Sequence, residues 1–193
     1  MKTTLETAPA AEPVSTAEAK THMRIASSYT SDDTYISSLI TIAREHIENV
    51  TWRKLITQTW NYYLDSFPSG GYINIPFGSL QSVSSVVYTD SDGDNTTWSS
   101  SEYIVDTGSI IGRVVLAYGY TWPNFTAYPS NPIKIQYVCG YGDTGASVPD
   151  SLLHAIKLLV ADMYENREIL IPNVQFANSQ TFESLIQNYR IRF

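Results

Sequence analysis

Residues 33–65, DTYISSLITIAREHIENVTWRKLITQTWNYYLD, decide the fold, because the spacing of their apolar residues changes halfway along the stretch. In the first half, apolar residues recur at the three- and four-residue spacing of one helix face. From Ile56 to Asp65, β-branched and aromatic residues alternate roughly with polar ones, as they do in a strand. We therefore predict a helix that ends near Val50 and a strand after it. The helical stripe consists of Ile36, Leu39, Ile40, Ala43, Ile47 and Val50.

Further segments of β-branched and aromatic residues follow downstream, separated by glycine, proline, serine and asparagine. Asp92-Gly93 is a strong signal for a tight hairpin turn, because glycine readily takes the positive φ that such a turn needs. We therefore predict an antiparallel sheet or a small barrel between about residues 56 and 141. Further strands are expected at residues 72–75, 83–89, 102–106, 113–117 and 133–138.

Helical periodicity returns after Pro149, with a broad apolar stripe from Leu152 to Tyr164. A shorter helix is expected from Thr16 to Arg24, because Ser15-Thr16-Ala17-Glu18 has the form of a capping box. An apolar helix face must be buried to hold its helix, so the two long helices are expected to pack together.

The sequence thus predicts an α+β fold. Its core is a helical hairpin or small helical bundle, with a large antiparallel β insertion between the long helices and an extended C-terminal arm. The parts are expected as a flexible N-terminal leader at 1–14, a helical part of the core at 15–55, a β-rich insertion at 56–147, a core helix at 148–168, and an arm or short helix at 169–193.

Composition excludes several classes of protein. The chain of 193 residues has a formal net charge of −7, so it lacks the basic surface of an autonomous nucleic-acid binder. One cysteine, Cys139, allows no internal disulfide. No apolar run is long enough to span a membrane, and the N-terminus lacks the apolar core of a signal peptide. Aromatic residues reach 12%, which suits either a β-rich fold or contact surfaces with other proteins.

The chemical motifs are weak, and we expect no catalytic residues, metal site or cofactor. The run from Asp90 to Asn95 has alternating carboxylates, but glycine stands fourth and no glutamate stands twelfth, so it fits a hairpin tip better than a calcium loop. A nucleophilic Cys139 would need a base. His22, His46 and His154 are all expected on helices, so a cysteine hydrolase is a minor alternative.

The insertion is dense in aromatic rings, and sugars stack on exposed rings. Strand alternation suggests that about half of these rings point into a core. A phage tail or baseplate protein with a carbohydrate-binding β domain is therefore the main alternative function. The rings are Trp98, Tyr103, Tyr118, Tyr120, Trp122, Phe125 and Tyr128.

Taken in order, motifs along the chain resemble the family of tailed-phage head–tail connector (adaptor) proteins. No single motif is diagnostic, but the ordered set is far more specific, and it spans roughly Thr16 to Glu168. The motifs include AKTHMRI at 19–25, AREHIE at 43–48, TWRKLITQTW at 51–60, LDSFP at 64–68, INIP at 73–76, YVCGYG at 137–142 and YENRE at 164–168.

This resemblance implies a structural part of the neck of a virion or of a gene transfer agent particle. Such a protein forms a homo-oligomeric ring, commonly of twelve subunits, beneath the portal protein. The ring extends the channel through which double-stranded DNA passes without sequence-specific binding, and it offers a platform for a stopper or tail-completion protein. The family implies no enzymatic activity and no membrane partner.

The last part of the chain combines aromatic and aliphatic residues with two arginines. We expect either a docking arm, directed at the portal or at a neighbouring subunit, or an ordinary helix packed on its own domain. Ordering an arm costs about 1–2 kcal/mol of backbone entropy per residue, so its anchors would have to be buried. The candidate partner-binding residues are Phe176, Phe182, Leu185, Tyr189, Arg190, Arg192 and Phe193.

Overall fold

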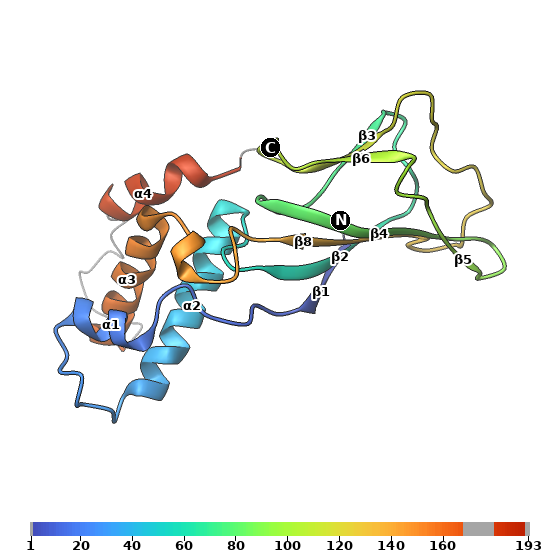
Figure 1. Cartoon of the computed structure of the whole chain (residues 1–193). Helices are drawn as coiled ribbons and strands as arrows, with labels where there is room; N and C mark the ends of the chain where they lie inside the picture. Colours follow the sequence, from blue (N-terminus) through green and yellow to red (C-terminus); the bar gives the residue numbers. More distant parts are fainter. Residues whose placement is uncertain (1, 168–179, 192–193) are drawn as a thin grey trace. The chain divides into compact units, whose positions relative to one another are not determined.

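The computed structural model describes residues 2–167 and 180–191, and the chain divides into two compact units (Figure 1). The β unit comprises Met1–Pro9 and Thr57–Tyr141, and the helical unit comprises Ala10–Ile56 and Gly142–Phe193. The chain therefore passes from one unit to the other three times. The α+β fold class is confirmed.

The helical unit is built on α2 (Asp33–Thr51) and α3 (Asp150–Glu165), with α1 (Thr16–Met23) and α4 (Gln180–Ile186) packed against them. Short 3-10 turns lie at Gly145–Ser147 and Gln187–Tyr189. The predicted stripes supply the core, since the buried side chains include Ile36, Leu39, Ile40, Ala43 and Ile47 of α2, and Leu152, Ala155, Ile156 and Val160 of α3.

The capping box at the start of α1 is confirmed. The Glu18 N–H donates to Ser15 Oγ at 3.2 Å, and the Ser15 N–H donates to Glu18 Oε2 at 2.9 Å. The Ser15 hydroxyl also donates to Glu18 Oε2 at 2.7 Å, and this hydrogen bond and the one from the Ser15 N–H lower the pKa of Glu18. Two of the free N–H groups at the helix start are thereby satisfied, which gives this short helix a fixed beginning.

The larger sheet of the β unit is antiparallel, with the order β1-β2-β8-β4-β5 (Figure 1). Its central strand β8 alternates strictly, and Ile133, Ile135, Tyr137 and Cys139 are fully buried on one face. That alternation sets the register, because a slip of one residue would turn the buried set outward. The strands are β1 (Lys2–Thr7), β2 (Gln58–Leu64), β4 (Leu80–Thr89), β5 (Asn95–Thr97) and β8 (Ile133–Cys139).

The second sheet is three-stranded, with the order β3-β7-β6. These strands are β3 (Tyr72–Asn74), β6 (Tyr103–Asp106) and β7 (Arg113–Leu116). Its inner side carries Ile73, Val114 and Tyr103, which are buried. The Tyr103 ring lies 4.9 Å from the Trp98 ring, and the Trp98 N–H bonds to the Val86 carbonyl of β4 at 2.8 Å. The two sheets thus share one core.

Two predictions about the chain's organisation need correction. Residues 1–14 are not simply a flexible leader, because Lys2–Thr7 form β1 at the edge of the larger sheet, paired with β2. Three threonines favour a strand there, a signal that the alanines and prolines of residues 8–14 obscured. The β unit also ends at Tyr141, before residue 147. Gly142 forms a bridge with Ile56, and Gly145 packs so closely on the Pro13 carbonyl that a Cβ would clash.

The predicted hairpin at Asp92-Gly93 is confirmed, since β4 pairs with β5 around it and Gly93 has φ of 91°. The strand Asn95–Thr97 itself was not predicted, because three exposed polar residues carry no alternation. None of the helices within residues 2–167 and 180–191 has the length and apolar character needed to cross a membrane.

Candidate assembly surfaces

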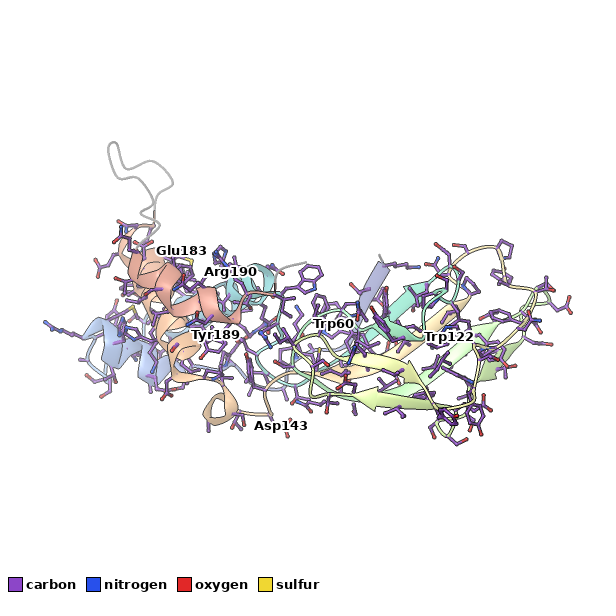
Figure 2. All side chains as sticks on the ribbon, turned by 90° about the horizontal axis from the view of Figure 1, so that it is seen from above. Trp60, Trp122, Asp143, Glu183, Tyr189 and Arg190 are labelled. Carbon is purple, nitrogen blue, oxygen red and sulfur yellow. The ribbon has the colours of Figure 1, made fainter. Side chains whose placement is uncertain are left out.

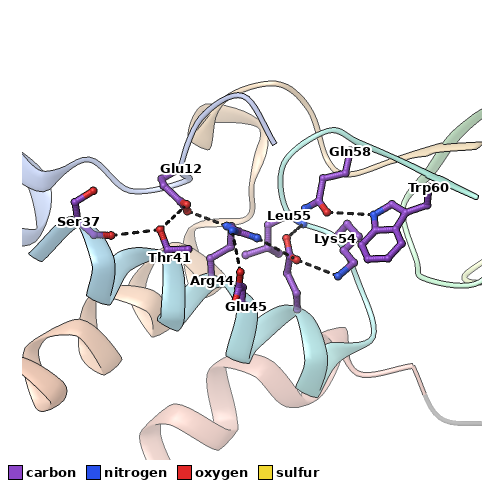
Figure 3. A network of polar contacts seen from close by, with 10 residues as sticks. Glu12, Ser37, Thr41, Arg44, Glu45, Lys54, Leu55, Gln58 and Trp60 are labelled. Atoms are coloured by element: carbon purple, nitrogen blue, oxygen red, sulfur yellow. Dashed lines mark hydrogen bonds and ion pairs between the residues drawn. The ribbon is translucent and has the colours of Figure 1, made fainter. Parts of the chain in front are cut away.

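A buried network of charges holds the chain segments that leave the helical unit (Figure 3). Arg44 of α2 pairs through Nε with Glu12 Oε2 at 2.8 Å and through Nη1 with Glu48 Oε2 at 3.3 Å. Lys54 Nζ lies 3.2 Å from the same Glu48 oxygen, and the Leu55 N–H donates to Glu48 Oε1 at 3.0 Å. Burial opposes the charge of Arg44, but the Glu12 and Glu48 carboxylates outweigh it and raise the pKa of Arg44. Residues before α1 and after α2 are thus fixed on one helix.

A second polar cluster joins the start of α2 to the end of α3. Asp32 is the N-cap residue of α2, yet its side chain makes no cap hydrogen bond. Its carboxylate instead accepts from Tyr164 Oη at 2.5 Å and from Arg167 Nη2 at 3.2 Å. The Tyr164 hydrogen bond lowers the pKa of Asp32 and raises that of Tyr164. The Arg167 guanidinium lies over the Tyr35 and Tyr164 rings. Because these contacts join the start of α2 to the end of α3, the two long helices run antiparallel.

Four of the predicted partner-binding residues lie on the C-terminal element at residues 180–191. Phe182 is half-buried, with its ring 6.2 Å from that of His46 on α2, and Leu185 is also half-buried. The Tyr189 carbonyl accepts from Arg53 Nε at 2.7 Å, and Arg190 forms a two-point ion pair with Glu183 at 2.9 and 3.1 Å (Figure 2).

This C-terminal element is a packed helix in the described structure. Ile186 and Ile191 are buried, and the Ile191 N–H donates to the Thr51 carbonyl at 3.1 Å. Of the two alternatives for residues 169–193, residues 180–191 therefore take the packed helix. Phe176, Arg192 and Phe193 lie outside the described residues.

Many rings of the β unit pack on one another. The Phe67 and Trp122 rings are stacked at 5.1 Å, Trp122 Nε1 donates to the Gly70 carbonyl at 2.8 Å, and Phe125 lies 4.7 Å from Tyr88. Trp98 is buried and contacts Phe67 and Trp122. By contrast, Tyr118, Tyr120 and Tyr128 are exposed. Figure 2 shows Trp122 among the strands of this unit.

The residues considered for chemistry do not form a reactive site in the described chain. Cys139 is fully buried. The Asp90 carboxylate accepts the N–H groups of Asp92 and Asp94, both at 3.0 Å, as a hairpin tip requires. His22 and His154 face each other edge to face at 5.6 Å. Within residues 2–167 and 180–191, no group of three or more histidines, cysteines or carboxylates is placed to hold a metal ion.

Comparison with solved structures identifies the class of fold. A chain in the neck of an empty gene transfer agent particle, with C6 symmetry, superposes with a TM-score of 0.84 at 21% identity. A chain of the native gene transfer agent virion gives 0.81 at 21%, and one in the native neck with C12 symmetry gives 0.79 at 23%. Each alignment covers 100% of this chain and 97% of the other. The protein therefore has the fold of these neck proteins.

A second comparison concerns the sequence itself. Residues 15–108 match the model of the phage gp6-like head-tail connector protein family, in line with the resemblance that the ordered motifs indicate. The matched residues begin at the capping box and run through α1, α2 and the strands β2 to β6. No curated protein matches the chain.

Proposed function

We propose that this protein is a structural head–tail connector (adaptor) subunit of a tailed phage or gene transfer agent particle. Twelve copies form a ring below the portal that extends the DNA channel and joins the head to the tail. The family match over residues 15–108 carries this proposal, and the likeness of the whole fold to neck proteins supports it. The net charge of −7 suits a channel through which DNA slides without being held.

The packing of the helical unit suits a ring wall. The apolar stripes of α2 and α3 pack together to form its core. Buried ion pairs fix the chain segments that lead out of this unit. A subunit of a cyclic ring presents two different faces to its neighbours, so the position of one face relative to the other must stay constant. A rigid helical unit meets that need.

A particle that lacks this protein tests the function. We expect DNA-filled heads and free tails, both of normal appearance in electron micrographs, with no joined particles. Adding the purified protein should restore joining. Joined particles in its absence, or a protein located away from the neck in a reconstruction, would contradict the proposal. Binding of host-surface glycans by the purified monomer would favour the tail or baseplate alternative.

We further propose that the C-terminal element contacts the head side, on the portal or a neighbouring subunit. The candidate residues remain Phe176, Phe182, Leu185, Tyr189, Arg190, Arg192 and Phe193. Deleting the whole element is a poor test, because Ile186 and Ile191 belong to the helical core. The double variant Arg192→Ser/Phe193→Ser leaves Ile186 and Ile191 unchanged. We expect it to melt like the parent protein and to lose binding to tail-less heads.

The matched control for this test is Ser184→Ala, which changes an exposed residue of α4. It should bind heads like the parent protein. If Arg192→Ser/Phe193→Ser also binds normally, these last two residues do not take part in head docking.

A further inference from the structure

The larger sheet of the β unit has an open edge on each side. One edge is β1. On the other side, β5 pairs only with Val87–Thr89 of β4, so the stretch 81–85 of β4 has no strand beside it among the described residues. An open edge presents unpaired backbone groups, which proteins usually protect with charged residues or proline. The stretch 81–85 contains neither, and residues 66–89 carry no charge. Bulges at Gln81 and Ser84 bend this strand without giving it a second partner.

One row of apolar side chains crosses the core face of this sheet from edge to edge. Leu5 of β1 lies opposite Trp60 of β2, which lies opposite Tyr137 of β8. Val83 of β4 lies opposite Tyr137 on its other side. Residues directly opposite one another share a face, and Tyr137 is fully buried. The row ends at half-buried Val83 and at Leu5, which is 47% exposed. In the five strands of this sheet, all of them described, Leu5 is the one large apolar side chain that is exposed.

The next row lies on the other face of the sheet and is polar along its whole length. The charged residues of β1 are held on this side by β2. Glu6 accepts from Asn61 Nδ2 at 2.8 Å, and Lys2 Nζ lies 4.7 Å from the centre of the Tyr63 ring. Both edges therefore have the same alternation, apolar toward the core and polar away from it. The polar row consists of Thr4, Asn61, Gln136 and Ser85.

The two edges also match in strand direction. The strands β1, β2, β8 and β4 pair antiparallel in that order, so β1 and β4 run in opposite directions. A second copy set beside the first, with its strands pointing the same way, brings its β1 antiparallel to the open stretch of β4. The core faces of both copies then lie on the same side, and Leu5 of one copy comes beside Val83 of the other. The molecule that fits both edges at once is therefore another copy of this chain.

We infer that β1 of each subunit pairs with residues 81–85 of β4 in the next subunit, so that the sheet continues around the ring. This inference rests on the proposed function, which supplies the ring. The contact joins two different patches of the chain, as a head-to-tail ring requires. Pairing of β1 with β1, or of β4 with β4, would stop at a two-fold dimer and leave the other edge open. A closed ring leaves neither edge unpaired, and it covers the exposed Leu5 side chain. A pairing of about five residues is marginal by itself, so the ring should be most complete where a head gathers the subunits.

Disulfide cross-linking of the full-length protein on tail-less heads tests which strands meet. Leu5→Cys/Val83→Cys places thiols at the two ends of the apolar row. Within one chain β2 and β8 separate these positions by about 14 Å, and a disulfide spans at most about 7 Å between Cα atoms, so this disulfide must join two copies. Thr4→Cys/Val83→Cys is the matched control, because Thr4 points to the other face of β1. Leu5→Cys/Thr97→Cys probes the edge formed by β5, and Leu5→Cys alone probes pairing of β1 with itself. The parent protein, whose Cys139 is fully buried, gives the background.

A charged substitution on the same strand gives a second measurement. Leu5→Glu places a carboxylate beside Val83 of the next subunit, whereas Thr4→Glu places it on the polar face. Both positions are exposed, so we expect both variants to melt like the parent protein. The number of subunits bound per head should fall at least tenfold for Leu5→Glu and stay unchanged for Thr4→Glu.

After mild oxidation, non-reducing gels should show a ladder of linked chains for Leu5→Cys/Val83→Cys, at least ten times stronger than for any other variant. A ladder of equal strength from Thr4→Cys/Val83→Cys or Leu5→Cys/Thr97→Cys, or dimers from Leu5→Cys alone, would show a different contact and overturn the inference. So would the absence of cross-links in a variant that binds heads normally, or normal head binding by Leu5→Glu. Failure of the parent protein to bind heads would instead overturn the proposed function.

Discussion

The helical unit and the β unit use the same kinds of residue in opposite ways. In the helical unit, apolar stripes are buried and charged residues such as Glu48 are drawn inside and paired. In the β unit, one sheet face is buried, and apolar side chains such as Ile104 and Tyr118 remain on the surface. The first arrangement stabilises the monomer, whereas the second leaves free energy to be gained when a partner covers it.

This difference means that equivalent substitutions should have unequal consequences in the two units. A change in the helical unit should act on folding and only through folding on assembly. A change at the sheet edge, such as at Leu5, should leave folding unaltered and act on assembly alone. Direct measurement of stability beside particle joining separates the two effects.

The largest loss of stability is expected from Glu48→Ala. The substitution leaves Arg44 and Lys54 buried without their shared carboxylate and removes the acceptor of the Leu55 N–H. Removing one partner of a buried ion pair costs about 3–5 kcal/mol. Urea denaturation followed by circular dichroism measures this loss.

Glu45→Ala is the control, because Glu45 also faces Arg44, at 3.6 Å, but its side chain is 61% exposed. We therefore expect this variant to lose about 0–1 kcal/mol of stability. Equal losses would mean that the buried network does not stabilise the unit.

Truncating one isoleucine in each unit sharpens the comparison. Ile47→Ala opens a cavity in the fully buried face of α2, and we expect a loss of about 2–5 kcal/mol. Ile104→Ala removes the same atoms from an exposed position, so the change should stay within about 0.5 kcal/mol. Thermal and urea unfolding of both variants checks this. A large destabilisation by Ile104→Ala would place that side chain in the core of the β unit.

Periodic burial made the helical unit predictable from the sequence. The stripe from Ile36 to Val50 and the stripe after Pro149 each repeat over several turns, and a pattern of that length has one simple structural solution. The capping box was equally readable, because both of its hydrogen bonds join residues three apart in sequence. These elements could be predicted because the pattern or the hydrogen bonds that define them join residues close in the sequence.

The surfaces were harder to predict because they depend on pairing between distant residues. Nothing near Ile104 indicates that it lies beside Val115 and Tyr72, since that arrangement follows from the register of three strands. The strand Lys2–Thr7 was missed for the same reason: its partner β2 lies more than fifty residues away. The contacts of the Asp32 carboxylate are non-local in the same way, because its donors Tyr164 and Arg167 lie near the end of α3.

A smaller effect is expected from Ser15→Ala at the start of α1. This variant loses the Ser15 hydroxyl that accepts from the Glu18 N–H, and alanine cannot replace it. Loss of an N-cap side chain costs about 1 kcal/mol. Ser37→Ala, at an exposed position within α2, serves as the control and should be neutral or slightly stabilising, since alanine favours a helix interior. A shift in the urea midpoint for Ser37→Ala as large as that for Ser15→Ala would mean that the cap does not anchor the helix.

The smallest expected effect is a pH dependence that belongs to the helical unit alone. Burial, together with the nearby positive charges of His154 and Lys157 on α3, lowers the pKa of His22. The unfolded chain therefore binds a proton at this residue more readily than the folded one. The contribution of neutral His22 to stability is complete above the unfolded pKa of about 6.5 and is lost as the pH falls through and below it. Melting temperatures at pH 7.5 and pH 5.5 should thus differ less in His22→Gln than in the parent protein. If the melting temperature of His22→Gln depends on pH as strongly as that of the parent protein, protonation of His22 does not affect the packing of α1 on α3.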